Sequence, residues 1–556
     1  MVRRNWQIKK ITDEALSLSK KFNISPITAQ ILLNRNVKDF QSFLYGNLSS
    51  LYPPQLLPDI TKAVERINFA IKNDEKILVV GDYDVDGITS VVIFYEFAKN
   101  FSKNFSFYIP HRLNEGYGLQ KKIIQQAKKN GQTLIITFDC GTNSFTEIEL
   151  AKKYKIDVIV VDHHQPKENL NNQFAFINPK RKDASYPFSD LSSAAISFKL
   201  LQLLTGKTCY SNLDLVALSL VCDVVPLRGE NRTLLKEGIK LLKNTERIAI
   251  KALCEISKLK QENIDTYHIG YILGPRINAS GRIACAKEAL DFFLTEDQKK
   301  AFDIANKFQE YNQLRRDIET KILKEAQAKI ERELISDYAI VVYDDGWHPG
   351  VLGIVASRLV DKYYKPSFVF SFDEKIGRGS ARSIHSLHLM EVLDKCAPLL
   401  QLYGGHKKAA GMQILKSDIG AFKEKINSLI KENLKPQDFI PVLEIDAQLD
   451  FKDITFRLIE EIKLLEPFGE DNPQPQFVTF GVYKKNILKN SKNSYSLWLT
   501  KENLTYEAVV YNEDFLDLIN FADTFDIVYT IDWNSFYKVP KLIIRDLRLS
   551  DGASKS

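Results

Sequence analysis

"GDYDVDGITS", residues 81–90, follows the apolar run "ILVV" at 77–80. Three carboxylates, Asp82, Asp84 and Asp86, stand at alternate positions, and Gly87 comes directly after them. The apolar run is typical of a buried strand. Three like charges at the end of such a strand repel one another unless cations or hydrogen-bond donors offset them. We therefore expect this stretch to carry a function.

Two later stretches have the same build. "TLIITFDCG" covers 133–141 and "DVIVVDHHQP" covers 157–166, and helical patterns lie between the apolar runs. Short apolar runs that alternate with helices predict a doubly wound parallel sheet in an α/β fold. The acidic residues then stand at the carboxyl ends of the strands, which is the edge of an open α/β sheet where ligands bind.

The composition is that of a soluble globular protein of several domains. The chain has 556 residues, of which 44% are hydrophobic and 26% charged, and a domain takes about 100–200 residues. No apolar stretch approaches the roughly 18 residues of a membrane span, and the start "MVRRNWQIKK" does not resemble a secretory signal. The six cysteines are scattered without a CxxC pair, which favours reduced thiols and a cytoplasmic location.

The basic excess lies in the first four-fifths of the chain. Residues 441–556 contain 13 Lys and Arg against 19 Asp and Glu, a net charge of −6. The first 440 residues therefore carry +12, because the whole chain carries +6. This distribution suits a polyanionic partner, although a lysine-rich surface without a partner fits it equally well.

The remaining patterns divide the chain into domains. A charged stretch without Gly or Pro predicts a long linker helix between two α/β domains, and a surface helix of a single domain is the alternative. "GPRINASGR" at 274–282 predicts a turn, and five strand-like runs near the end predict a small barrel. The expected segments are an N-terminal helical segment at 1–50, the first α/β (catalytic) domain at 51–300, the linker helix at 301–334, the second α/β domain at 335–435, an OB-like domain at 436–550 and a disordered tail at 551–556.

The acidic strand ends together predict a metal site. Asp139, His163 and His164 belong to the second and third runs, and Asp223 in "SLVCDVVPL" follows an apolar helical run. Carboxylates with one imidazole suit Mn²⁺ or Mg²⁺ better than zinc. Two such ions can activate a water and stabilise the leaving oxygen of a phosphodiester.

Each motif alone has a simpler explanation. An Asp after a strand is often a helix N-cap, which fits Asp139, and a pair of histidines is more often surface chemistry. A calcium loop is excluded because position 12 counted from Asp82 is Ile93, where an EF-hand needs Glu. Their joint occurrence on successive strand ends favours the metal site.

Several of these motifs resemble a known family. "VVGDYDVDGITS", "TFDCG", "VVDHHQP" and "LVCDVVPL" resemble the four motifs of the DHH phosphoesterase superfamily, in its RecJ-like branch. "YGGHKKAAG" at 403–411 resembles the glycine-rich motif of the accompanying DHHA1 domain, and "GPRINASGRI" and "GRGSARS" are similar to RecJ-like members. The resemblance covers about residues 50–435, and the barrel resembles an OB-type domain more weakly.

The resemblance implies roles for particular residues. It implies two Mn²⁺ or Mg²⁺ ions, with His164 facing the scissile phosphate or orienting a ligand, and with His406 stabilising the charge that develops on the phosphate. The implied metal ligands or their immediate neighbours are Asp82, Asp84, Asp86, Asp139, His163 and Asp223. Which aspartate bridges the two ions stays open.

The same resemblance implies a path for the strand and a pocket for its 5′-phosphate. Arginine forks match phosphate geometry and hydroxyls add short donors, and structural ion pairs are the alternative for any one arginine. The glycines of 404–411 would let backbone N–H groups approach a phosphate, against the alternative of a turn with exposed lysines. The residues concerned are Arg112, Tyr117, Arg276, Asn278, Arg282, Ser380, Arg382, His406 and Lys407.

The implied activity is a metal-dependent exonuclease that degrades single-stranded DNA from its 5′ end to 5′-mononucleotides, in DNA repair and recombination. A single-stranded-DNA-binding protein and a RecQ-type helicase are candidate partners, and no membrane is expected. Two alternatives are a DHH phosphodiesterase acting on short oligonucleotides or cyclic dinucleotides, and a non-catalytic replication scaffold. All four DHH motifs are intact, which disfavours the scaffold.

Overall fold

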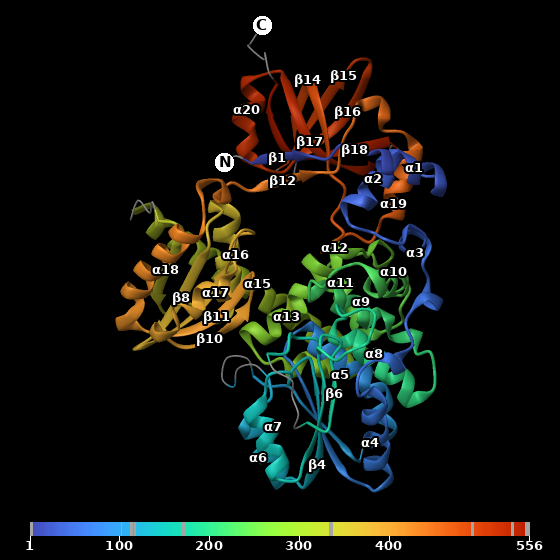
Figure 1. Cartoon of the computed structure of the whole chain (residues 1–556), viewed down its shortest axis with the longest axis vertical. Helices are drawn as coiled ribbons and strands as arrows, with labels where there is room; N and C mark the ends of the chain where they lie inside the picture. Colours follow the sequence, from blue (N-terminus) through green and yellow to red (C-terminus); the bar gives the residue numbers. More distant parts are fainter. Residues whose placement is uncertain are drawn as a thin grey trace. The chain divides into compact units, whose positions relative to one another are not determined.

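The computed structural model describes residues 4–101, 103–111, 115, 118–167, 173–332, 337–490, 494–534 and 539–550 (Figure 1). The chain forms two compact units. One comprises residues 51–439, and the other combines residues 1–50 with residues 440–556. The expected tail at 551–556, Arg112 and Tyr117 lie outside the described residues.

A five-stranded parallel sheet forms the first part of the larger unit. Its order is β3-β2-β4-β5-β6. The strands are β2 (Lys76–Gly81), β3 (Phe105–Tyr108), β4 (Gln132–Phe138), β5 (Asp157–Val161) and β6 (Ala175–Ile177). The predicted doubly wound α/β fold is thus confirmed, with β3 and β6 added to the three expected strands. Both are short, at four and three residues, so neither offers the long apolar run on which the prediction relied.

Helices cover both faces of this sheet (Figure 1). Successive side chains of a strand point to opposite faces. Leu78, Ile135 and Val158 pack against the helices of one face in a shared core. That face carries α6 (Lys121–Lys129) and α7 (Phe145–Lys153), and the other carries α4 (Ile60–Lys72), α5 (Val85–Ala98) and α8 (Ser193–Thr205).

A helical part follows the sheet. It contains α9 (Leu213–Cys222), α10 (Gly229–Leu242), α11 (Ile248–Ile256), α12 (Thr266–His268), α13 (Gly274–Ile283) and α14 (Lys287–Leu294). The turn expected at 274–282 is wrong, because this stretch forms α13, which begins with Pro275 in its first turn. Pro275 stands where the π-helical residues Ile269–Leu273 pass into α13, so its missing N–H falls at a change of the helical hydrogen-bond pattern. The long linker helix is confirmed as α15 (Gln298–Arg332).

The second α/β part has a mixed sheet of order β10-β11-β9-β8-β7. Only the β7–β8 pair is parallel, and the other pairs are antiparallel. The elements are β7 (Ile340–Asp345), β8 (Ser367–Asp373), β9 (Ile376–Arg382), β10 (Leu400–His406) and β11 (Ala409–Leu415), with α16 (Leu352–Tyr363), α17 (Leu389–Asp394) and α18 (Ile419–Asn433).

The smaller unit is built on a closed barrel. Pairs β14–β15, β15–β16, β16–β18, β18–β17 and β17–β14 complete the ring, which confirms the predicted OB-like domain. Its strands are β14 (Phe477–Lys489), β15 (Tyr495–Lys501), β16 (Leu504–Val510), β17 (Thr524–Asn534) and β18 (Val539–Leu549), with the short β13 (Ala447–Gln448), α19 (Phe456–Leu464) and α20 (Leu516–Phe521).

The N-terminal residues pack on this barrel. Their helices α1 (Asp13–Phe22), α2 (Pro26–Asn34) and α3 (Phe40–Tyr45) place Ala15, Ile31 and Phe40 in one hydrophobic core with barrel residues. The segment is not wholly helical, since β1 (Asn5–Ile8) pairs in parallel with β12 (Val442–Ile445). Residues more than 430 positions apart therefore share one sheet.

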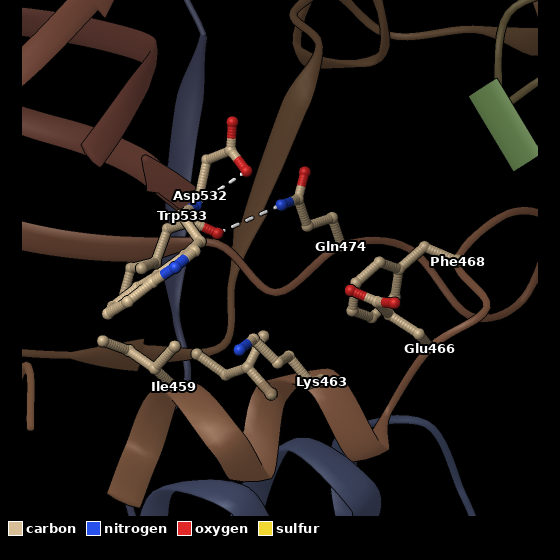
Figure 2. A pocket seen from close by; sticks show the side chains of 9 residues that line it. Ile459, Lys463, Glu466, Phe468, Gln474, Asp532 and Trp533 are labelled. Atoms are coloured by element: carbon tan, nitrogen blue, oxygen red, sulfur yellow. Dashed lines mark hydrogen bonds between the residues drawn. The ribbon is translucent and has the colours of Figure 1, made fainter. Parts of the chain in front are cut away.

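A small pocket lies between α19 and β17 (Figure 2). Ile459 and Lys463 face Trp533 across it, and the Lys463 ammonium lies 5.2 Å from the centroid of a Trp533 ring. The side-chain amide of Gln474 donates to the backbone carbonyl of Ile531 (3.2 Å). None of the residues predicted to bind metal or DNA lines this pocket.

Candidate metal centre

The acidic residues of three strands meet at one edge of the parallel sheet. Asp82 follows β2, Asp139 follows β4, and Asp162, His163 and His164 follow β5. The hydrogen bonds between the parallel strands continue past the strand ends. The N–H of Asp82 donates to the backbone carbonyl of Phe138, and the N–H of Asp139 donates to that of Val161. The parallel register therefore sets these side chains side by side.

The turn between β2 and α5 is shaped by Asp84 and Gly87. Asp84 is the N-cap of α5, and its carboxylate accepts the N–H of Gly87 (3.1 Å). A Cβ at Gly87 would lie 2.5 Å from the backbone carbonyl oxygen of Asp82. Glycine at this position thus allows the helix to begin directly against the backbone of Asp82.

Asp86 is held by the start of another helix. It is fully buried, and its carboxylate accepts the N–H groups of Ser193 and Ala194 (both 2.8 Å) at the N-terminus of α8, together with the hydroxyl of Ser219 (2.7 Å). Burial, and the charge of Asp84, raise its pKa to about 6. Ser219 is the first residue of the stretch "SLVCDVVPL", but neither Ser219 nor Ser193 was predicted to support this carboxylate.

His163 lies at the centre of the acids. Its Nε2 atom is 3.3 Å from carboxylate oxygens of both Asp139 and Asp223 and 3.7 Å from one of Asp86. Burial lowers the pKa of His163 to about 3, so the imidazole is neutral. A neutral ring nitrogen among carboxylates is a donor set that first-row divalent cations accept.

Three groups of ligand atoms in the described part of the chain have distances suited to a metal ion, with the atoms of each group within 4.8 Å of one another. The groups are Asp82, Asp84 and Asp139; Asp86, His163 and Asp223; and Asp139, His163 and His164.

The electrostatics of these residues fit bound cations. Burial, and then the charges of Asp86 and Asp84, raise the pKa of Asp139 and of Asp223 well above the ordinary value. Divalent cations at this point would offset that repulsion. Oxygen ligands with few nitrogens suit Mn²⁺ and Mg²⁺.

Asp162 has a different role from the other aspartates. One of its oxygens accepts from Nδ1 of His164 (2.7 Å) and from the N–H of His163 (2.8 Å), and the other accepts from the N–H of Thr142 (3.0 Å). Against the effect of burial, the charge of His164 and its hydrogen bond lower the pKa of Asp162. Although burial favours neutral imidazole, Asp162 raises the pKa of His164 to about 9. Asp162, which stands among the acidic strand ends but was given no predicted role, therefore orients His164.

His406 lies at the end of β10, where the predicted glycine-rich loop forms a β-hairpin. His406 pairs with Ala409 across a turn made of Lys407 and Lys408. The N–H of Lys408 donates to Nδ1 of His406 (3.3 Å), which leaves the proton of a neutral ring on Nε2. Burial, and then the charges of Arg382 and other cations that include His164, lower the pKa of His406.

Ser380 and Arg382 share one face of β9 beside the N-terminus of α16. A Cβ at Gly353, in the first turn of that helix, would lie 3.0 Å from Oγ of Ser380 and 3.1 Å from Nη2 of Arg382. A helix N-terminus with a hydroxyl and a guanidinium beside it is suited to an anion.

The residues predicted on α13 have contacts within the protein. Arg276 is buried, and its guanidinium donates to Gln309 (2.8 Å) and to the backbone carbonyl of Ile272 (2.6 Å). These contacts are hydrogen bonds to neutral groups and not the ion pairs of the structural alternative, and the place of Arg276 on the DNA path stays a prediction.

Asn278 and Arg282 of the same helix join it to other parts of the unit. Oδ1 of Asn278 accepts the N–H of Val85 (3.2 Å), so Asn278 supports the turn that carries the acids. Arg282 donates to the backbone carbonyl of Gly350 (3.1 Å), just before α16.

Sequence models of three families match the chain. "DHH family, N-terminal domain" matches residues 76–222, "DHHA1 domain" matches 336–432, and "RecJ OB domain" matches 445–546. The chain is 35% identical to the single-stranded-DNA-specific exonuclease RecJ of Bacillus subtilis, over 98% of this chain and 71% of the relative. The chain belongs to the RecJ family.

Other members of the RecJ family agree with this assignment. The Escherichia coli exonuclease RecJ is 30% identical over 84% of this chain and 85% of its own length. The crystal structure of RecJ from Thermus thermophilus in complex with Mn²⁺ shares the fold, with a TM-score of 0.85 over 99% of this chain and 80% of that one, at 24% identity. A crystal structure of exonuclease RecJ bound to manganese is 28% identical and has a TM-score of 0.60, over 68% of this chain and 96% of that one. The RecJ family thus accounts for both units of the chain.

Proposed function

We propose that this chain is a metal-dependent exonuclease that hydrolyses single-stranded DNA from its 5′ end and releases 5′-mononucleotides. The observation that carries the proposal is the meeting of Asp86, Asp139, His163 and Asp223 at one sheet edge, within a chain of the RecJ family.

The proposed metal ligands are the acids and the neutral histidine of this edge. Asp82, Asp84, Asp86, Asp139, His163 and Asp223 would hold two Mn²⁺ or Mg²⁺ ions, in keeping with the manganese in a related RecJ structure. Such ions supply positive charge to the phosphodiester oxygens and a water of lowered pKa.

The histidines act on the substrate side in this proposal. His164 has Nδ1 bonded to Asp162, so Nε2 is the ring nitrogen that orients a ligand or a phosphate oxygen. His406 donates from Nε2 to a non-bridging oxygen, where a donor is worth most as negative charge develops. Lys407, exposed at the tip of the hairpin, adds positive charge next to it.

We propose that Ser380 and Arg382 hold the 5′-phosphate at the N-terminus of α16. The Ser380 hydroxyl and the Arg382 guanidinium lie beside Gly353 in the first turn of α16, and the backbone N–H groups of a helix N-terminus are a third kind of donor. We also propose that Arg282 contacts the DNA strand, because its side chain is only half-buried. Besides burial, the charges of both Arg382 and His164 lower the pKa of His406, which relates this phosphate site to the metal centre. Capture of a terminal phosphate there would favour cleavage from that end of the strand.

A first test is digestion of single strands and duplexes labelled at the 5′ or the 3′ end, with Mn²⁺, with Mg²⁺ and with a chelator. We expect labelled mononucleotide to appear first from the 5′-labelled single strand, and no product with the chelator. Equal rates on a dinucleotide and on a long strand would favour the short-oligonucleotide phosphodiesterase instead.

A second test replaces proposed metal ligands. His163→Ala and Asp86→Ala should each lower kcat/KM by more than about a hundredfold, because even residues that only support metal ligands contribute about 10- to 100-fold. Asp303→Ala, which changes an exposed aspartate on α15, is the matched control. A fully active His163→Ala enzyme would remove the metal assignment.

The proposal extends to the setting of the activity. We place it in DNA repair and recombination in the cytoplasm, with a single-stranded-DNA-binding protein or a RecQ-type helicase as protein partners. None of the helices in the described part of the chain is long and apolar enough to cross a membrane. Co-purification of the full chain with either partner is the direct measurement.

A further inference from the structure

An exposed pair of tyrosines lies on the helical part of the larger unit. Tyr267 and Tyr271 are 59% and 67% exposed, and their rings stack with centroids 5.1 Å apart at 26°. Large aromatic side chains dominate buried cores, so two stacked and exposed rings need an explanation.

The pair sits on an unusual piece of backbone. Residues Ile269–Leu273 form a π-helix that leads directly into α13. Such segments are rare and are frequent at functional sites. Tyr267 stands in α12 and Tyr271 in the π segment, four residues apart, a spacing that places two side chains next to each other on one face of a helix.

This segment packs against the helix that ends in a proposed metal ligand. A Cβ at Gly270 would lie 3.4 Å from a methyl group of Val221, and one at Gly274 would collide with Sγ of Cys222. Cys222 is the last residue of α9, and Asp223 follows it as the C-cap. The two glycines thus bring the tyrosine segment onto the end of α9 beside the metal centre.

Another apolar side chain is exposed directly after Asp223. Val224 is 61% exposed and has φ +56°, a conformation that is costly for a β-branched residue. Val224, which directly follows the proposed ligand Asp223, is therefore another exposed apolar side chain beside the metal centre.

We propose that Tyr267 and Tyr271 form a stacking platform for nucleobases of the substrate strand next to the metal centre. This inference rests on the proposed function, and it adds a site for the bases to sites that hold phosphates. Bases stack on aromatic rings without sequence preference, as a nuclease that degrades any sequence requires. The two rings are already parallel enough for a base to continue the stack.

The test compares strands that differ only in their bases. Binding of the full chain to a 5′-phosphorylated oligothymidylate and to an abasic strand of equal length is measured by fluorescence anisotropy with a chelator present. We expect Tyr271→Leu to weaken binding of the oligothymidylate about tenfold and to leave binding of the abasic strand unchanged. Tyr271→Phe keeps the ring and should bind like the wild type.

Tyr210→Leu is the matched control, because it removes a tyrosine of the same unit that is 39% exposed. Equal loss of binding to both strands, or no loss with either strand, would overturn the platform. In the second case the exposed tyrosine pair would fit a protein partner instead. If the wild-type chain cleaves single strands and Tyr271→Leu binds the oligothymidylate as tightly as the wild type, only the platform is refuted. If the wild-type chain neither binds nor cleaves single strands, the proposed function is refuted as well.

Discussion

Two kinds of buried carboxylate meet at the carboxyl edge of the parallel sheet. Asp162 is surrounded by donors, and its pKa is lowered. Asp139 and Asp223 lie among other acids, and burial and neighbouring charge raise their pKa. The first kind is satisfied by the protein itself, and the second kind gains from a cation. This contrast separates the residue that positions His164 from the residues proposed to hold metal ions.

At the residue scale, we expect Asp162→Asn to lower kcat about 10- to 100-fold, because the neutral amide no longer orients His164 through a charged hydrogen bond. The pKa of His164, which Asp162 raises to about 9, should fall toward its ordinary value. Histidine NMR titration of the variant measures that shift independently of the rate. Unchanged kinetics together with an unchanged titration of His164 would contradict the role given to Asp162.

The helices of the smaller unit are joined by a buried carboxylate. Glu461 of α19 accepts the N–H of Ser25 (2.8 Å) and the hydroxyl of Thr28 (2.6 Å) at the N-terminus of α2. A negative charge there also interacts favourably with the helix dipole. Burial opposes ionisation, but the hydrogen bonds from Ser25 and Thr28 and the bond from Arg457 lower the pKa of Glu461.

At the element scale, Glu461→Gln should lower the free energy of unfolding by about 2 kcal/mol at neutral pH. Because the folded-state pKa is lowered, the contribution is complete above the unfolded value of about 4.3 and is lost as the pH falls through the folded value. The difference between variant and wild type should therefore shrink in acid. Denaturant unfolding at several pH values measures it, with Glu460→Gln on the exposed side of the same helix as control. A difference that does not change with pH would argue against the ionised carboxylate.

The whole molecule consists of two units, and each combines segments of different character. Residues 51–439 hold the metal centre and the proposed phosphate site, while residues 1–50 share a core with residues 440–556. The acidic barrel therefore cannot be removed without exposing the apolar side chains of α1, α2 and α3, such as Ala15, Ile31 and Phe40.

At the scale of the molecule, we expect the chain 51–439 to fold alone and to cleave short oligonucleotides with Mn²⁺, but to bind long single strands more weakly than the full chain. A chain that ends at residue 439 should instead carry an N-terminal segment that proteases remove quickly, because its core partners are missing. Limited proteolysis and anisotropy with long strands measure both effects. Full affinity of 51–439 for long strands would remove the barrel from DNA binding.

Local features of this protein could be predicted from the order of its residues. Apolar runs ending in acids located β2, β4 and β5, and strand-like runs located all five barrel strands, because side-chain periodicity is a local property. Such patterns also selected Asp82, Asp139, His163 and Asp223, which the structure brings together.

The packing and hydrogen bonds between segments far apart in the sequence were decided only by the tertiary structure. The N-terminus of α8 lies under Asp86, α13 lies against the turn that carries the acids, and residues 1–50 lie on the barrel. An expected turn is instead the helix α13, and Arg276 is kept inside the protein. These outcomes depend on packing between residues far apart in the chain, and hydrogen bonds formed across such distances leave no periodic trace in the sequence near either partner.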